Sequence, residues 1–235
     1  MKYFKLLTLS MLSLAMLFSC SNVQSKDNGK PSELQASDIL KKIRKGEKIA
    51  YSNAIVYGDL DFSDTDEWVL TSASHVTVDI AQDIFFQNCV FMGKVSSYSI
   101  LKDKKGKSLP MKKKVRFGGN VCFFNCDFRD EVDICEANIM NDMIFSRSTF
   151  NKKSSFSRVL VNGSTCQFTE INANEFFLFA NNTIRGNLNF MDAHFSRNFV
   201  LSELTATDLI LNNASFDGKF ELSNSTLYGI VQFNY

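Results

Sequence analysis

The first residues whose spacing could do chemistry lie in an acidic stretch, GDLDFSDTDEW, at residues 58–68. Its carboxylates include Asp59, Asp61 and Asp64, and clustered oxygen ligands of this kind are what calcium prefers. The stretch lacks the glycine of an EF-hand loop, and Leu70 falls where the distal glutamate should be. The alternation from Asp59 to Phe62 also predicts a strand with solvated carboxylates pointing outward. We therefore expect no metal centre and no cofactor. Asp59, Asp61 and Asp64 are the weak candidates for calcium ligands.

Histidine and serine chemistry has little support. The two histidines, His75 and His194, lie far apart in the sequence, and two histidines alone do not complete a metal site. The sequence has no HExxH, GxSxG or phosphate-cradling glycine motif. These observations predict that the protein is not an enzyme.

The cysteines do not form a recognisable metal or redox motif. Five follow Cys20, an odd number, and no two of them have C-x-x-C spacing. We expect most of them to be small buried hydrophobic side chains. They are Cys89, Cys122, Cys126, Cys135 and Cys166.

A lysine-rich segment, KDKKGKSLPMKKK, occupies residues 102–114. Clustered cations attract polyanions, so the segment could bind anionic headgroups, glycan sulfates or the phosphates of lipopolysaccharide. The other interpretation is a solvated, mobile loop. The candidate anion-binding residues are Lys102, Lys104, Lys105, Lys107, Lys112, Lys113 and Lys114.

The first twenty residues are predicted to be a leader. Lys2 and Lys5 precede an apolar run that is too short for a membrane span, which needs roughly 20 apolar residues. The run ends in LFSC, which resembles the lipobox of bacterial lipoproteins and implies lipidation of Cys20. An ordinary secretory signal is the alternative. Residues 21–36 are polar and are expected to form a flexible tether.

The rest of the chain must position any site, and it is repetitive. From Val121 onward it divides into units of about eleven residues, with apolar or small residues at positions one, three, six and eight. This spacing excludes a helix and predicts short strands with alternate side chains inward. Two units per coil, about 22 residues, would stack the third positions in columns. One column reads Phe123, Phe145, Phe168, Phe190, Leu211 and Phe233. Turn formers such as Asn162-Gly163-Ser164 end the units and predict corners with positive φ.

The runs FSRSTF, FMDAHF and LNNASF resemble pentapeptide repeats, in which a small residue precedes a central Leu or Phe by two places. The resemblance implies a right-handed parallel β-helix, and here steps of five alternate with steps of six. We therefore predict an all-β solenoid of about 22 residues per coil over residues 49–235, with a short capping α-helix at residues 37–48. Ser37 or Asp38 would cap that helix, and Gly46 would end it.

Two further expectations follow from the register. FQNCVF matches FFNCDF 37 residues later, so Cys89 and Cys126 should stack in adjacent coils, near enough to consider a disulfide. At the other end the last coil has no predicted lid, which favours a homodimer there, as in many pentapeptide-repeat proteins. The candidate dimer residues are Leu227, Val231, Phe233 and Tyr235.

One corner of the predicted β-helix is acidic and gives the best enzyme hypothesis. Polysaccharide lyases on β-helices use clustered carboxylates, calcium and a basic residue on an outer face. The plainer interpretation is a charged corner of the kind that any soluble β-helix needs. The residues concerned are Asp127, Asp130, Glu131, Asp133 and Glu136, with Arg129 among them.

We therefore expect a non-catalytic interaction lipoprotein, held in the bacterial envelope by its lipid anchor and presenting a rigid β-helix to a protein or glycan partner. A glycan-binding or glycan-cleaving protein that uses the acidic corner is the alternative. The expected location is the outer membrane, with its periplasmic and outer faces both open. A net charge of +1 and the export signal disfavour nucleic acid as a partner.

Overall fold

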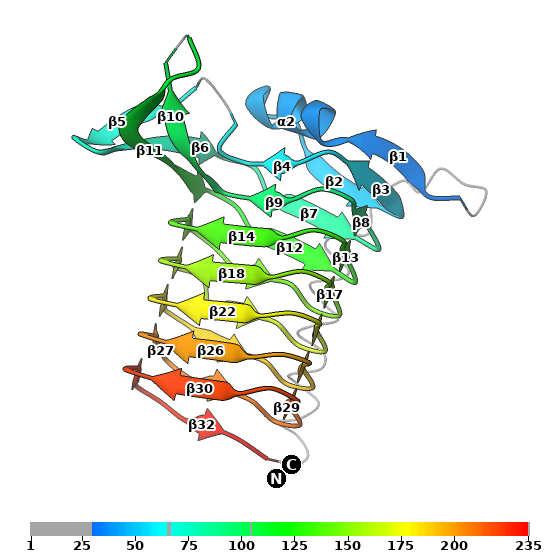
Figure 1. The fold of residues 1–235 in the computed structure, drawn as a ribbon, viewed down its shortest axis with the longest axis vertical. Coiled ribbons are helices and arrows are strands. Elements are labelled where there is room, and N and C mark those ends of the chain that lie inside the picture. Colours follow the sequence, from blue (N-terminus) through cyan, green and yellow to red (C-terminus); the bar gives the residue numbers. More distant parts are fainter. Residues whose placement is uncertain (1–29, 65–66, 104, 235) are drawn as a thin grey trace. The chain divides into compact units, whose positions relative to one another are not determined.

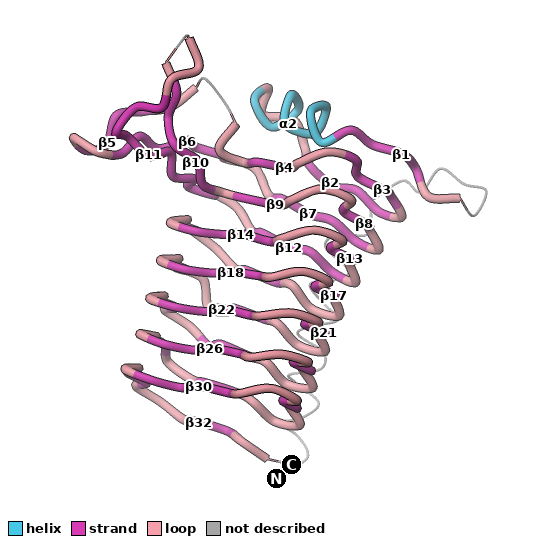
Figure 2. Tube along the Cα trace, in the orientation of Figure 1, coloured by secondary structure: helices cyan, strands magenta, loops and turns pink. Residues whose placement is uncertain are grey.

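The computed structural model describes residues 30–64, 67–103 and 105–234. Residues Pro31–Tyr235 form one compact unit, and the predicted leader and most of the tether lie outside the described residues. This unit is a parallel β-helix, as predicted: the chain winds through four sheets of short, regularly stacked strands (Figure 1). Turns separate the strands of each coil (Figure 2).

We label the four sheets A to D. Within the described residues, sheet A has eight strands: β1 (Ser32–Gln35), β3 (Ala54–Tyr57), β8 (Val90–Phe91), β13 (Asp127–Phe128), β17 (Thr149–Phe150), β21 (Asn172–Ala173), β25 (His194–Phe195) and β29 (Ser215–Phe216). Sheet B also has eight: β2 (Ile49–Ser52), β7 (Ile84–Gln87), β12 (Val121–Phe124), β16 (Met143–Ile144), β20 (Thr165–Gln167), β24 (Asn187–Asn189), β28 (Leu209–Ile210) and β32 (Val231–Gln232).

Sheets C and D complete each coil. In the described part of the chain, sheet C has seven strands: β4 (Leu60–Asp61), β9 (Val95–Ser96), β14 (Val132–Cys135), β18 (Ser154–Ser157), β22 (Phe177–Ala180), β26 (Phe199–Ser202) and β30 (Phe220–Ser223). Sheet D contains β5 (Val69–Ser72), β6 (His75–Ile80), β10 (Tyr98–Lys102), β11 (Ser108–Phe117), β15 (Asn138–Ile139), β19 (Leu160–Val161), β23 (Thr183–Ile184), β27 (Thr205–Ala206) and β31 (Thr226–Leu227).

The predicted columns form the core. Val121 pairs with Met143 one coil later, and Phe123 pairs with Phe86 one coil earlier. Stacked rings fill the interior, with centroids 4.8 Å apart for Phe123 and Phe145 and 5.2 Å apart for Phe168 and Phe190. Because one coil cannot cover its own apolar face, each coil depends on its neighbours for burial. The sequence prediction of inward third positions is confirmed for these residues.

The corners with positive φ are not where the turn formers predicted them. In the described units positive φ occurs instead at the fifth residue, or at the sixth in the longer unit that begins at Thr165, and some of these residues are charged, such as Glu136 (φ +50°) and Arg158 (φ +54°). A left-handed conformation is unfavourable for such side chains, and ion pairs between stacked corners offset part of the cost. The predicted glycine corners have another cause. A Cβ added to Gly186 would lie 2.0 Å from the carbonyl oxygen of Ser164, so glycine is required for close stacking of the coils.

The start of the unit differs from the sequence prediction. Residues 32–35, expected to be tether, form β1 and pair with β3. The helix α2 spans Ala36–Arg44, with Gln35 at the N-cap and no side-chain cap hydrogen bond, so the predicted capping by Ser37 or Asp38 is wrong. Asp38 instead pairs with Lys41 at 2.8 Å, on the exposed face of the helix. Ile39 and Leu40 are buried in the common core, as a helix that covers an open end of the stack requires.

The lysine-rich insertion is a hairpin rather than a mobile loop. Strands β10 and β11 are antiparallel, and the second half of β11 also pairs with β6 in parallel. Together with the β5–β6 hairpin, these strands project from the side of the stack near its first coils (Figure 1). The insertion therefore adds an ordered element to an otherwise regular ladder.

Candidate functional site

The projecting hairpin orients its cations by strand alternation. Along β11, Val115 and Phe117 point inward and are buried, so Lys112, Lys114 and Arg116 point outward. The pairing with β6 sets Lys112 beside His75 and Arg116 beside Asp79. Outward side chains of neighbouring strands therefore meet on one face of sheet D.

Glu136 is the centre of this face. Its carboxylate lies 3.1 Å from Nζ of Lys114, 3.6 Å from Nζ of Lys112 and 3.2 Å from Nε of Arg158. Nε2 of His75 is 3.4 Å away. Four groups from three parts of the chain thus converge on one carboxylate, and we call these groups, together with Glu136, the Glu136 cluster.

The electrostatics of the Glu136 cluster favour an ionised carboxylate. Burial opposes ionisation, but Lys114, Arg158 and Lys112 together outweigh burial and lower the pKa of Glu136. One negative charge faces three permanent positive charges, so the cluster keeps a positive surplus. Such a surplus at a protein surface attracts anions.

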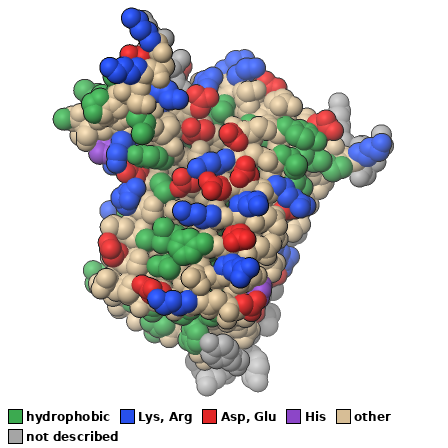
Figure 3. Space-filling model, in the orientation of Figure 1, with side chains coloured by type: hydrophobic (Ala, Val, Ile, Leu, Met, Phe, Trp, Pro, Cys, Tyr) green, Lys and Arg blue, Asp and Glu red, His purple; other side chains and the backbone are tan. Residues whose placement is uncertain are grey.

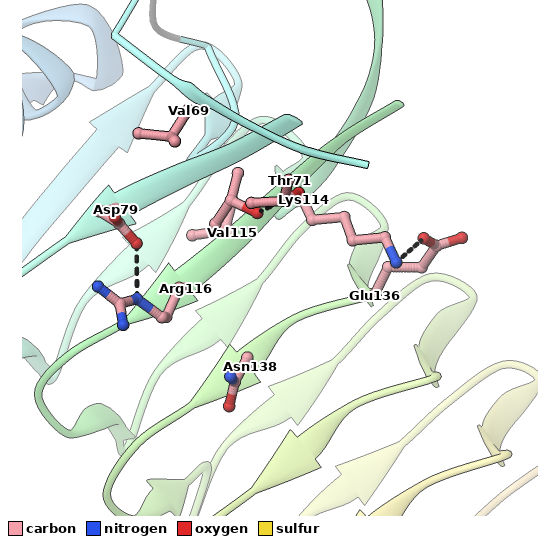
Figure 4. A pocket seen from close by; sticks show the side chains of 9 residues that line it. Val69, Thr71, Asp79, Lys114, Val115, Arg116, Glu136 and Asn138 are labelled. Atoms are coloured by element: carbon pink, nitrogen blue, oxygen red, sulfur yellow. Dashed lines mark hydrogen bonds and ion pairs between the residues drawn. The ribbon is translucent and has the colours of Figure 1, made fainter. Parts of the chain in front are cut away.

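Lys114 and Glu136 also line an open pocket of about 440 Å³, which we call the groove. Its walls carry two ion pairs, Arg116 to Asp79 at 2.7 Å and Lys114 to Glu136 at 3.1 Å (Figure 4). The side chains of Val69, Thr71, Thr77 and Asn138 and the strand at Val115, whose own side chain points into the core, complete the lining. The groove therefore offers charged and neutral hydrogen-bonding groups beside short apolar surfaces.

The other insertion lysines lie on the projecting hairpin. Lys102 ends β10, and Lys105 and Lys107 lie in the turn, where their backbone N–H groups donate to Oδ1 of Asp103 at 2.8 Å and 2.9 Å. Lys113 follows Lys112 in β11 and points to the opposite side of the strand. Blue side chains gather over this projecting part in Figure 3. Lys104 lies outside the described residues.

The three calcium candidates are engaged separately. Oδ1 of Asp59 accepts a hydrogen bond from the N–H of Lys94 at 2.9 Å. Oδ1 of Asp61 accepts from the hydroxyl of Ser63 at 2.7 Å, and burial raises the pKa of Asp61. Asp64 lies 3.7 Å from Arg44. In the part of the chain that the structure describes, no three His, Cys, Asp or Glu side chains are grouped to hold a metal ion.

The predicted acidic group is divided between two corners, and within it only Glu131 and Asp133 share a cation. Asp127, on sheet A, pairs with Arg129 at 2.6 Å. Glu131 and Asp133 share Nζ of Lys94, at 3.5 Å and 3.3 Å. The carboxylate of Asp130 accepts a hydrogen bond from the backbone N–H of Glu131. Glu136 belongs to a different face, so the prediction of one acidic corner is wrong in its geometry.

The second histidine is isolated from the Glu136 cluster. His194 lies between Ala193 and Phe195, which are buried, so its side chain points outward. Its ring nitrogens lie 2.8 Å from Oγ of Ser215 and 3.2 Å from Oγ of Ser196. It therefore belongs to the polar ladder on the outside of sheet A.

The predicted stacking of Cys89 and Cys126 is confirmed by the strands on either side of them, which are in register. The backbone N–H of Asp127 donates to the carbonyl oxygen of Cys89 at 2.8 Å. Both thiols are free and buried. The thiol of Cys126 lowers the pKa of Cys89, whereas burial raises the pKa of Cys126. Cys135 and Cys166 are also free and buried, and Cys122 is partly exposed.

Sequence reasoning considered Glu136 and His75 separately and did not connect either one to Arg158. One signal was available, because Arg158 follows Glu136 by one coil and stacks on it, as the pairing of β14 with β18 shows. Asp79 had the same kind of signal, because Arg116 follows it by 37 residues, the offset that also relates Cys126 to Cys89. Thr71 had none, since β5 pairs with β6 in the antiparallel direction and does not follow the repeat.

The last described coil exposes apolar side chains. Val231 is 52% exposed and Phe233 is 40% exposed, while Leu227 is half-buried. Tyr235 lies outside the described residues, as does Cys20. Among the described residues, none forms a further coil over Val231 and Phe233.

Compared with known proteins, the chain matches no family model, no curated protein and no solved structure. The described residues contain no helix that is long and apolar enough to cross a membrane.

Proposed function

We propose that the protein is a non-catalytic interaction lipoprotein of the bacterial envelope. Lipidation of Cys20 would hold it at a membrane, and the polar residues that follow would space the β-helix from the lipid surface. The resemblance of LFSC to a lipobox and of the coils to pentapeptide repeats supports this role. The outer membrane is the proposed location.

The projecting hairpin is the observation that carries the proposal. It interrupts a regular stack, yet it is held in place by the pairing of β11 with β6 and by the ion pairs of Glu136. An ordered, charged element that projects from a rigid support loses little conformational entropy when it binds a partner. We infer that this face, rather than the plain ladders, meets a glycan or protein partner.

A glycan-cleaving role has less support. The polysaccharide lyases that suggested this role use clustered carboxylates and calcium on one outer face. Among the described residues of the acidic corner, Asp127, Glu131 and Asp133 are each paired with a cation. Glycan binding without cleavage remains compatible with the groove beside Glu136.

We further propose that two copies associate through their C-terminal coils. The last strands of the sheets leave backbone groups at an edge, and Val231 and Phe233 expose apolar surface beside them. Open β-helix ends of this kind favour pairing with another chain. A second copy presents the same surface, as a symmetric dimer requires.

Two measurements test the role. Radiolabelled palmitate should enter the wild-type chain in cells and should not enter Cys20→Ser. For the interaction, the protein lacking residues 1–20 is sedimented with isolated bacterial envelopes, beside a variant in which an Asn-Gly turn replaces residues 101–111. We expect the shortened hairpin, which loses Lys102, Lys105 and Lys107 but keeps Lys112 and Lys114, to weaken co-sedimentation. Equal co-sedimentation of both proteins would contradict an interaction through the hairpin.

A further inference from the structure

We propose that Lys112, Lys114 and Arg158 bind the sulfate or carboxylate groups of an anionic polysaccharide. This inference rests on the proposed interaction role and names the ligand class for its projecting face. It concerns the Glu136 cluster and the groove beside it, and it involves no chemical step.

The cations of the Glu136 cluster are exposed, whereas its carboxylate is buried. The side chain of Glu136 is only 6% exposed, whereas those of Lys112, Lys114 and Arg158 are 47%, 35% and 55% exposed. The negative charge is therefore hidden beneath the cations, and solvent meets the positive groups. An arriving anion would contact the cations without meeting the carboxylate directly.

The cationic side chains are held in place before any ligand binds. The backbone N–H of Glu136 donates to the carbonyl oxygen of Ser157 at 2.9 Å, which fixes the corner that carries the carboxylate. Arg158 occupies the equivalent corner of the next coil, and Lys112 and Lys114 lie on a strand with partners. Long cationic side chains normally lose rotamer freedom when they bind an anion. Here the carboxylate already gathers them, which lowers that entropic cost.

The lining of the groove favours a polysaccharide over a lipid surface. The Glu136 cluster adjoins a groove lined by the hydroxyls of Thr71 and Thr77 and the amide of Asn138 (Figure 4). These groups match the hydroxyls of a sugar chain, and the apolar side chain of Val69 can pack on the face of a sugar ring. A flat bilayer would not enter a groove, whereas a single glycan strand can lie along one.

The hairpin extends the positive field beyond the Glu136 cluster. Lys105 and Lys107 are exposed at its turn, so a long polyanion would feel attraction before it reaches the groove. Exposed charge pairs are screened by salt, with a Debye length of about 8 Å at physiological ionic strength. Binding should therefore weaken as salt rises.

The test uses the full-length protein in detergent and three immobilised polysaccharides: heparin, polygalacturonate and neutral dextran. The variant is Lys112→Gln with Lys114→Gln, and the matched control is Lys152→Gln with Lys153→Gln, which removes the same charge at an exposed corner between β17 and β18. We expect the variant to bind the two anionic polymers about tenfold more weakly and the control to bind as the wild type does. Dextran should bind none of them.

Further variants keep the proposal falsifiable. Arginine at both Lys112 and Lys114 should restore binding because it keeps the charge, and Arg158→Gln provides an independent loss if the double glutamine variant melts early. Equal affinity of the double variant and its control for both polymers would overturn the proposal. Tighter, lysine-dependent binding to phosphatidylglycerol vesicles than to either polymer would also overturn it. If the shortened hairpin weakens envelope binding while polymer binding does not depend on Lys112 and Lys114, only this inference fails and the proposed role stands.

Discussion

Replacing Phe190 with alanine tests the inward register that builds the whole stack. Phe190 has no exposed surface and contacts the rings of five other phenylalanines, with centroid distances from 5.1 to 6.4 Å. Removing a buried ring costs its transfer free energy and leaves a cavity, which together amount to about 3–5 kcal/mol. Rings of the same coil and of the preceding coil, with Leu211 in the next coil, restrict collapse of the cavity, so we expect a loss of about 4 kcal/mol.

For a unit of this size, that loss corresponds to a fall in Tm of about 8–16 °C. The assay is urea and thermal unfolding followed by far-ultraviolet circular dichroism. The control is Phe124→Ala, because Phe124 points outward beside Arg147, with the guanidinium 5.4 Å from the ring centroid. We expect the control to change stability by less than about 1 kcal/mol. If both variants lose the same stability, the assignment of the Phe190 side chain to the core is wrong.

Three other predictions follow from the structure. Gly186→Ala should destabilise the protein by about 1–3 kcal/mol in urea unfolding, because its Cβ would meet the carbonyl of Ser164. Gly118→Ala should cost less, because its Cβ would lie 3.2 Å from the nearest atom, the carbonyl oxygen of Ala81. Because the pKa of Glu136 is lowered in the folded protein, its ionised form adds stability above the ordinary pKa of glutamate. That added stability is lost as pH falls through the lowered pKa. Glu136→Gln should therefore be less stable than wild type at pH 7, and the unfolding curves of the two proteins should converge in acid. A wild-type dimer in light scattering should become a monomer in Phe233→Asp, and a monomer in both would refute association through the last coil.

Much of the fold was readable from local pattern. Phe123, Phe145 and Phe168 recur at one position of each coil, and alternation along a strand decides which side chains face inward. Because every coil repeats the same requirement, an error in one unit would be contradicted by the next. The 37-residue offset that stacks Cys126 on Cys89 was fixed in the same way.

The corners were harder to predict because their causes are not local. Turn residues such as Gly163 and Gly186 suggested positive φ, but their role depends on how closely the backbone of the preceding coil approaches. Likewise, Ser37 and Asp38 were plausible helix caps by residue type. The helix begins earlier, at Ala36, where pairing of β1 with β3 leads the chain into it.

The sequence by itself determined the β-helix, its register and the inward columns, since these follow from a repeated local spacing that each coil obeys. Only the tertiary structure decided the candidate site. His75 and Lys112 become neighbours because β11 pairs with β6, and Arg158 joins them because stacked corners bring its guanidinium over Glu136. β6 and β11 keep the same 37-residue offset as Cys89 and Cys126, but no repeat shows that the lysine-rich insertion extends β11 as a hairpin or that the corner at Glu136 faces it. The convergence of these charges therefore appears only once the chain is folded.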